Sequence, residues 1–170
     1  MTGARVRLPL AVLAVLVVQT SLLPAVNIDD VRPDALLLFA IAGGLVAGAE
    51  GGALIGFGVG VVADLFVQTP LGLSALTFSL VGFTVGSLQA GIIRASWWIT
   101  PITALFASAA GVVLFAVIGA VVGQSQLVTP RLAEIAGLVA VMNAVLALPT
   151  VALVRWALPR RASAERAYAR

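Results

Sequence analysis

The chain has 170 residues, of which 61% are hydrophobic and 10% are charged, and its mean hydropathy is +1.14. A soluble domain is nearer half apolar and a quarter charged, so this composition excludes a soluble globular domain, a disordered chain and a coiled coil. The absence of Cys and His excludes thiol catalysis, disulfides, Cys/His zinc sites and imidazole proton transfer. A net charge of +3 is too small to indicate nucleic-acid binding. An integral membrane protein remains.

The apolar segments have the length of transmembrane helices. A bilayer core of about 30 Å requires roughly 20 helical residues. With this length as a guide, the chain divides into residues 6–26, 33–49, 51–67, 71–93, 97–122 and 132–158. The breaks between these segments contain polar or turn residues, and several prolines lie near the predicted helix starts, where a missing N–H costs little. We predict a single all-α membrane domain over residues 1–170, built as a bundle of six transmembrane helices.

The second and third segments are the shortest of the six. Each has about 17 residues, at the lower limit for a span, and only Glu50 and the glycines that follow it separate the two. They can form a short or tilted hairpin, or part of the pair can be re-entrant. At the N-terminus, Arg5 and Arg7 precede an apolar run and an LLPAV sequence that together resemble a signal peptide. We expect this helix to be retained, and its cleavage would leave five spans.

The basic residues, all of them Arg, predict the orientation. With both termini in the cytoplasm, the cytoplasmic side carries Arg5, Arg7, Arg94, Arg155, Arg160, Arg161, Arg166 and Arg170. Only Arg32 and Arg131 then lie outside, which agrees with the positive-inside rule. This orientation places Trp97, Trp98 and Trp156 near the cytoplasmic interface. It also predicts that the Arg-rich tail, residues 159–170, contacts anionic lipid head groups.

Small residues recur every four positions in the middle of the chain. The series is Gly44, Gly48, Gly52, Gly56 and Gly60, followed by Asp64. Four residues advance about 400° around a helix, so the last part of the series forms one face of the segment 51–67. Gly82 and Gly86 repeat the pattern in the next segment. Such faces let two backbones approach closely in lipid, either within the bundle or against the transmembrane helix of a partner.

Few polar side chains fall within the predicted helices. Asp64 lies about one turn from the outer end of its helix, where it either marks a functional site or pairing, or is hydrated and caps the QTPLG turn. Asn143 lies near the centre of the last helix, and we expect its amide to bond to another helix. Arg131 and Glu134 predict a local ion pair.

The scattered carboxylates argue against enzymatic activity. An intramembrane aspartyl protease needs two carboxylates together, and Asp64 alone lies near a helix interior. We therefore predict no catalytic residue, no cofactor and no metal. A small-molecule site needs convergent polar groups, and the candidates Asp64, Gln68, Asn143 and Glu134 form a sparse set for such a site.

Residues 32–91 contain an ordered combination of features that resembles a known family. A Pro-Asp pair opens a Leu-rich helix, followed by a Gly-Phe pair, an Asp that closes the next helix, a Leu-Gly turn and a Gly-rich helix. These residues are Pro33, Asp34, Gly56, Phe57, Asp64, Leu71, Gly72, Gly82 and Gly86. The combination resembles the rod shape-determining protein MreD family. Phe83 departs from the family pattern, in which we expect a Tyr at this position.

The resemblance implies a non-enzymatic scaffold of the bacterial cell-wall elongation complex in the cytoplasmic membrane. It implies MreC as a partner, and MreB, RodA and the transpeptidase of RodA as further members of the complex. It also implies a fold related to the substrate-binding subunits of energy-coupling-factor transporters, so the alternative function is that of a vitamin-binding subunit. We expect the nine residues above, with Gly60 and Asn143, to act in structure or partner contact, and we expect no small-molecule substrate.

Overall fold

The computed structural model describes residues 2–23, 27–66, 70–92 and 98–158, and within these ranges every regular element is helical. The elements are α1 (Thr2–Val17), the π-helical η1 (Val18–Leu22), α2 (Ala35–Phe66), α3 (Leu73–Ile92), α4 (Ile99–Val121), the 3₁₀ turn η3 (Ser125–Leu127) and α5 (Leu132–Ala157). The predicted all-α class is confirmed. The sequence analysis assigned roles to Gln68, Arg94, Trp97 and the tail 159–170, which lie outside the described residues.

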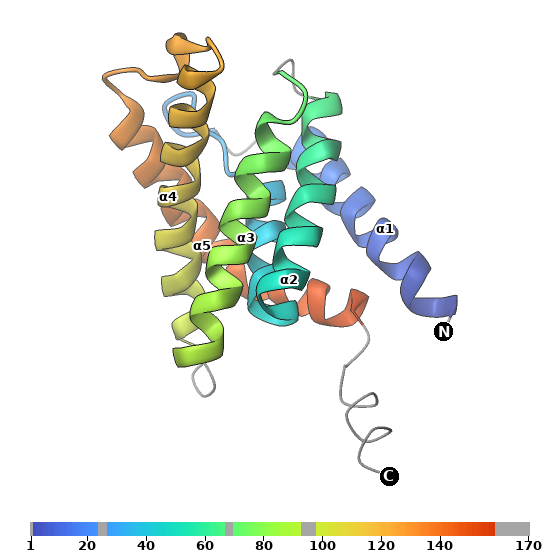
Figure 1. The fold of residues 1–170 in the computed structure, drawn as a ribbon. Coiled ribbons are helices and arrows are strands. Elements are labelled where there is room, and N and C mark those ends of the chain that lie inside the picture. Colours follow the sequence, from blue (N-terminus) through green and yellow to red (C-terminus); the bar gives the residue numbers. More distant parts are fainter. Residues whose placement is uncertain (1, 24–26, 67–69, 93–97, 159–170) are drawn as a thin grey trace.

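The prediction of six transmembrane helices is wrong, because the described ranges hold five α-helices. The segments predicted at 33–49 and 51–67 belong to one element, α2, in which only Gly48 has non-helical dihedrals, with φ 76° and ψ −171°. Figure 1 shows α2 running down the bundle and turning back upward beside α3. A Cβ atom placed on Gly52 would lie 2.6 Å from the Cα atom of Gly44, so the two halves of α2 pack against each other.

We call residues 35–47 and 49–66 the first arm and the second arm of α2. The first arm has about 13 residues and rises about 20 Å, which is less than the roughly 30 Å of a bilayer core. It therefore cannot form a full span by itself. Three described helices, α2, α4 and α5, are long and apolar enough to cross a membrane, whereas the apolar helices at Val6–Leu22 and Leu73–Gln89 are shorter.

The first arm occupies the centre of the bundle. Every residue from Ala35 to Leu45 is buried, and those from Phe39 to Ala42 expose none of their surface. The second arm, α1, α3, α4 and α5 surround it, and α3 packs most extensively on α2. A helix that is apolar on all sides is stable either in lipid or when other helices enclose it. Because the first arm is too short to span the bilayer and is enclosed, this segment, predicted as a membrane span, is the core of the protein.

Helix α3 lies in the groove between the two arms, and glycines line the contact. A Cβ atom on Gly82 would collide with the carbonyl oxygen of Gly52 and would lie 3.3 Å from that of Ala40. A Cβ atom on Gly56 would collide with the carbonyl oxygen of Phe78. The glycine face of the sequence is thus used for packing inside the bundle, where it brings three backbone segments together.

The two described ends of the chain lie on the same side of the bundle. Figure 1 shows the start of α1 and the end of α5 at its lower end, which we call the termini end. There the guanidinium carbon of Arg7 lies 5.5 Å from the ring centroid of Trp156, a cation–π contact between α1 and α5. The opposite end, which we call the loop end, carries residues 27–34, the start of α3 and η3.

Substitution of Gly56 by Ala tests the backbone contact between α2 and α3. The new methyl group must displace the Phe78 backbone, and overpacking of this kind costs about 1–3 kcal/mol. Gly58→Ala is the matched control, because a Cβ atom there has open space on the same arm. We expect thermal unfolding in mild detergent to show a lower midpoint for Gly56→Ala and an unchanged or higher one for Gly58→Ala. Equal midpoints for the two variants would contradict the close contact.

Candidate functional site

The start of α2 lies inside the bundle and carries the densest set of polar contacts. Pro33 is fully buried and Asp34 caps the helix, because its Oδ1 atom accepts a hydrogen bond from the Leu37 amide at 2.9 Å. An N-cap side chain of this kind satisfies one of the free amides of the first helical turn. The remaining groups of this turn are out of reach of bulk water and need partners from other helices.

Asn143 of α5 provides two of these contacts. Its Oδ1 atom accepts from the Asp34 amide at 3.2 Å, and its Nδ2 atom donates to the Asp34 carbonyl oxygen at 3.1 Å. The same Nδ2 atom donates to the hydroxyl of Ser108 in α4 at 3.0 Å. Asn143 and Ser108 are both completely buried. The predicted bond between Asn143 and another helix is confirmed, and its main partner is the backbone of residue 34.

Gln19 of η1 closes the same junction from the other side. Its Oε1 atom accepts from the Ala35 amide at 2.8 Å, and its Nε2 atom donates to the Pro33 carbonyl oxygen at 3.4 Å. The start of α2 is therefore held directly by side chains of η1 and α5, and Ser108 of α4 bonds to Asn143. The sequence analysis did not select Gln19 or Ser108. Their signal was a polar side chain within an apolar helix, the same signal that pointed to Asn143.

Asp64 caps the start of α3 from the end of the second arm. Its carboxylate accepts hydrogen bonds from the amides of Gly72 at 2.8 Å, Ser74 at 3.0 Å and Ala75 at 3.3 Å. The side chain is buried, with 4% of its surface exposed. Of the alternatives for Asp64, capping of the following turn is confirmed. The positive end of the α3 dipole also stabilises the carboxylate.

The predicted partner-contact residues divide into a buried set, an exposed set and Asp34, which is half-buried. Pro33, Gly56, Gly60, Asp64, Gly82, Gly86 and Asn143 are buried. Phe57 and Leu71 expose 55% and 76% of their surface, and Gly72 is exposed beside Leu71. A partner can touch the exposed residues directly, whereas it is affected by the buried ones only through the fold they hold.

The expected ion pair at the loop end is confirmed. The guanidinium of Arg131 contacts the Glu134 carboxylate at 3.0 and 3.1 Å, one turn into α5. The hydrogen bond to Glu134 and the Glu134 charge raise the pKa of Arg131 above its ordinary value. Both side chains are exposed, so this pair contributes little to stability.

The polar side chains described above form hydrogen bonds mainly with the backbone of the bundle. Asp64 and Asn143, which the sequence grouped as possible ligands of one site, bond to different helix starts. Every buried side-chain nitrogen or oxygen in the described ranges has a hydrogen-bond partner. Over the same ranges, no three His, Cys, Asp or Glu side chains gather as metal ligands. The chemistry that these groups support is the closure of buried helix ends.

Replacement of Asn143 by Ala leaves the Asp34 amide without its side-chain partner, while the Asp34 carbonyl keeps its bond to the Leu38 amide. Unpaired buried backbone groups cost about 1–3 kcal/mol, so we expect a lower free energy of unfolding in detergent. Thr150→Ala is the control on the same helix, since the Thr150 hydroxyl bonds only to the Leu146 carbonyl of its own helix. An Asn143→Ala protein as stable as Thr150→Ala would show that the junction does not hold the start of α2.

Replacement of Asp64 by Ala removes the acceptor of the Gly72, Ser74 and Ala75 amides. Loss of an N-cap costs roughly 0.5–2 kcal/mol. We expect these three amides to exchange hydrogen faster in detergent-solubilised protein, while Asp64→Asn, which keeps one acceptor oxygen, has a smaller effect. Unchanged exchange in Asp64→Ala would exclude the capping role.

Comparisons with known proteins connect this architecture to one family. No curated protein and no solved structure matches the chain. The expected likeness to substrate-binding subunits of energy-coupling-factor transporters therefore has no support. A family model described as rod shape-determining protein MreD matches residues 2–157, a range that runs from the start of α1 to the end of α5. The chain therefore belongs to the MreD family of rod shape-determining proteins, a family of membrane proteins known for shape determination and not for enzymatic activity.

Proposed function

We propose that this chain is the membrane scaffold of the cell-wall elongation complex, and that it couples MreC and the wall synthases to the cytoplasmic MreB filament. The observation that carries this proposal is the match to a shape-determining family over almost the whole helical bundle. The structure supports it in a second way, because the buried polar groups of the bundle close helix ends, as expected for a protein that acts through its surface.

An exposed face of the second arm offers a surface for a partner helix. Leu54, Phe57, Val61 and Leu65 follow one another at helical spacing and expose 37% to 75% of their surface. Gly58 lies on the same face with open space above it, so large side chains flank a notch. A helix of MreC that places a side chain in this notch gains the close packing that drives association in lipid.

The two ends of the bundle suit the two sides of the complex. Arg7, which contacts Trp156, and Arg155, in the last turn of α5, lie near the termini end, and the positive-inside rule assigns such Arg residues to the cytoplasm. In the proposed orientation the termini end lies at the cytoplasmic side of the membrane, where it faces MreB. The loop end then faces the extracytoplasmic domains of MreC, RodA and the transpeptidase of RodA.

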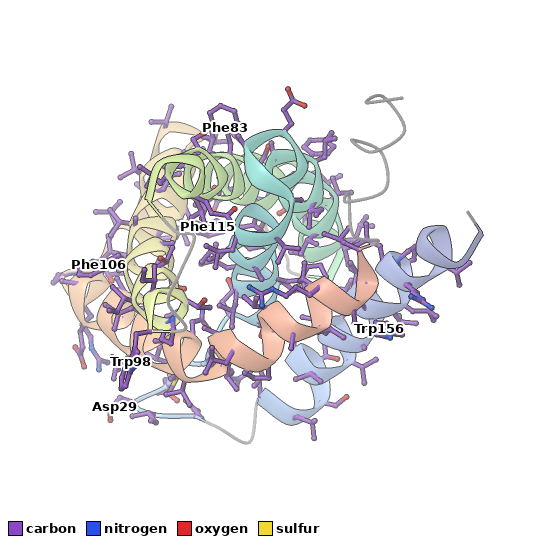
Figure 2. All side chains as sticks on the ribbon, turned by 90° about the horizontal axis from the view of Figure 1, so that it is seen from below. Asp29, Phe83, Trp98, Phe106, Phe115 and Trp156 are labelled. Carbon is purple, nitrogen blue, oxygen red and sulfur yellow. The ribbon has the colours of Figure 1, made fainter. Side chains whose placement is uncertain are left out.

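The test combines depletion with site-specific photocrosslinking in living cells. We expect depletion of this protein to turn rod-shaped cells round while nutrient uptake is unchanged. A photoreactive residue in place of Phe57 should restore rod shape and, on illumination, link the protein to MreC. Phe106 of α4 is the matched control, since it is a phenylalanine with 68% exposure on the periphery of another helix (Figure 2).

Two results would contradict the proposal, each at a different level. Normal shape and normal wall incorporation after depletion would exclude the scaffold function. Equal crosslinking to MreC from positions 57 and 106 would leave the scaffold function intact but exclude the second arm as the preferred surface.

A further inference from the structure

A cavity of about 220 Å³ lies near the loop end, between η1, both arms of α2, α3 and α4. Most of its lining is apolar, but polar side chains from three different segments reach it. These are Gln19, Thr20, Asp34 and Ser74. A mostly apolar cavity with a few convergent polar groups is the usual form of a small-molecule site. Apart from Asp34, the sequence analysis selected none of these lining residues.

The one ionisable side chain of the lining is acidic. It is Asp34, whose pKa is raised above its ordinary value by burial, and no basic residue lines the cavity. The cap bond to the Leu37 amide and the backbone bonds to Asn143 hold Asp34 in place whether or not a ligand is bound. A cation that enters the cavity favours the ionised form of the carboxyl, and the two charges then attract each other more strongly than they would in water.

The apolar part of the lining is rich in aromatic rings. Phe66, Phe78 and Phe115 all contribute to it, and Phe115 points toward the interior of the bundle in Figure 2. Ring faces attract ammonium groups as well as apolar surface. For size, an engineered apolar cavity of about 150 Å³ holds one benzene molecule. The present cavity therefore has room for one ring, or a chain of similar volume, that carries a small head group.

We propose that this cavity is a binding site for an organic ammonium compound, with the cationic head at Asp34 and a small apolar body among the phenylalanines. The ammonium group can belong to a free amine or to the head group of a zwitterionic lipid, because both present the same chemistry. The proposal goes beyond the scaffold function and does not depend on it.

Calorimetric titration of the purified full chain in an uncharged maltoside detergent tests the site. The probes are phenethylammonium, 2-phenylethanol and phenylacetate, which have similar size but differ in charge. We expect saturable binding of one phenethylammonium per chain, at least tenfold weaker binding of the alcohol, and no binding of the anion. This series uses the wild-type protein, so it does not depend on the folding of any variant.

Asp34→Asn adds a second readout. Asn is as good an N-cap as Asp, so the variant keeps an acceptor for the Leu37 amide and loses only the charge. We expect it to bind phenethylammonium at least tenfold more weakly than wild type. Asp64→Asn is the matched control, because it removes a buried carboxylate that does not line the cavity, and it should bind as wild type does.

Competition distinguishes the source of the ligand. In nanodiscs, displacement of phenethylammonium by phosphatidylethanolamine but not by phosphatidylglycerol would support a lipid head group, and displacement by neither lipid would support a free amine. The proposal is overturned if the cation fails to bind, if the neutral alcohol binds as tightly, or if Asp34→Asn binds like wild type.

Discussion

A helix that starts inside an apolar bundle must find partners for its first amides among side chains, because lipid offers none. The first arm of α2 is such a helix. Its start receives contacts from Gln19, Asn143 and its own cap, Asp34. These bonds fix the height and rotation of the central helix relative to η1 and α5, while the Asn143 bond to Ser108 includes α4. The arrangement of the bundle follows from the need to satisfy one buried helix end.

The contact between α2 and α3 meets a second requirement. Helices in lipid have no hydrophobic driving force toward each other, so another attraction must hold them together. Gly52, Gly56 and Gly82 let the backbones meet directly, so dispersion contacts replace the hydrophobic drive of soluble proteins. Because Asp64 also caps α3, the α2 hairpin and α3 form one tightly connected unit. A partner that packs on the exposed side of the second arm thus contacts an element that is fixed on its other side, which suits the transmission of force or position.

Local rules predicted a large part of this structure. Hydropathy located α3, α4 and α5 to within about two residues at each end, and simple spacing indicated the Arg131–Glu134 pair. A cap was one of the alternatives left open for Asp64. A short hairpin was one of the expected forms of residues 33–67, but as a pair of helices that meet at Glu50. The reversal lies instead at Gly48, which turns the chain without a loop, so both arms belong to one element. Gln19 and Ser108 were missed because their role depends on partners distant in the chain. The ordered features of residues 32–91 identified the family correctly.

The reversal at Gly48 also limits how this region can change in length. The dihedrals of Gly48 belong to a region that is essentially open to glycine alone, and no loop separates the arms. One residue inserted into the second arm would rotate everything before or after it by about 100° and turn part of the glycine face away from α3. The connection between α4 and α5, which is mostly exposed, can absorb such a change. Insertions and deletions should therefore accumulate between α4 and α5, while the α2 hairpin keeps a constant number of residues.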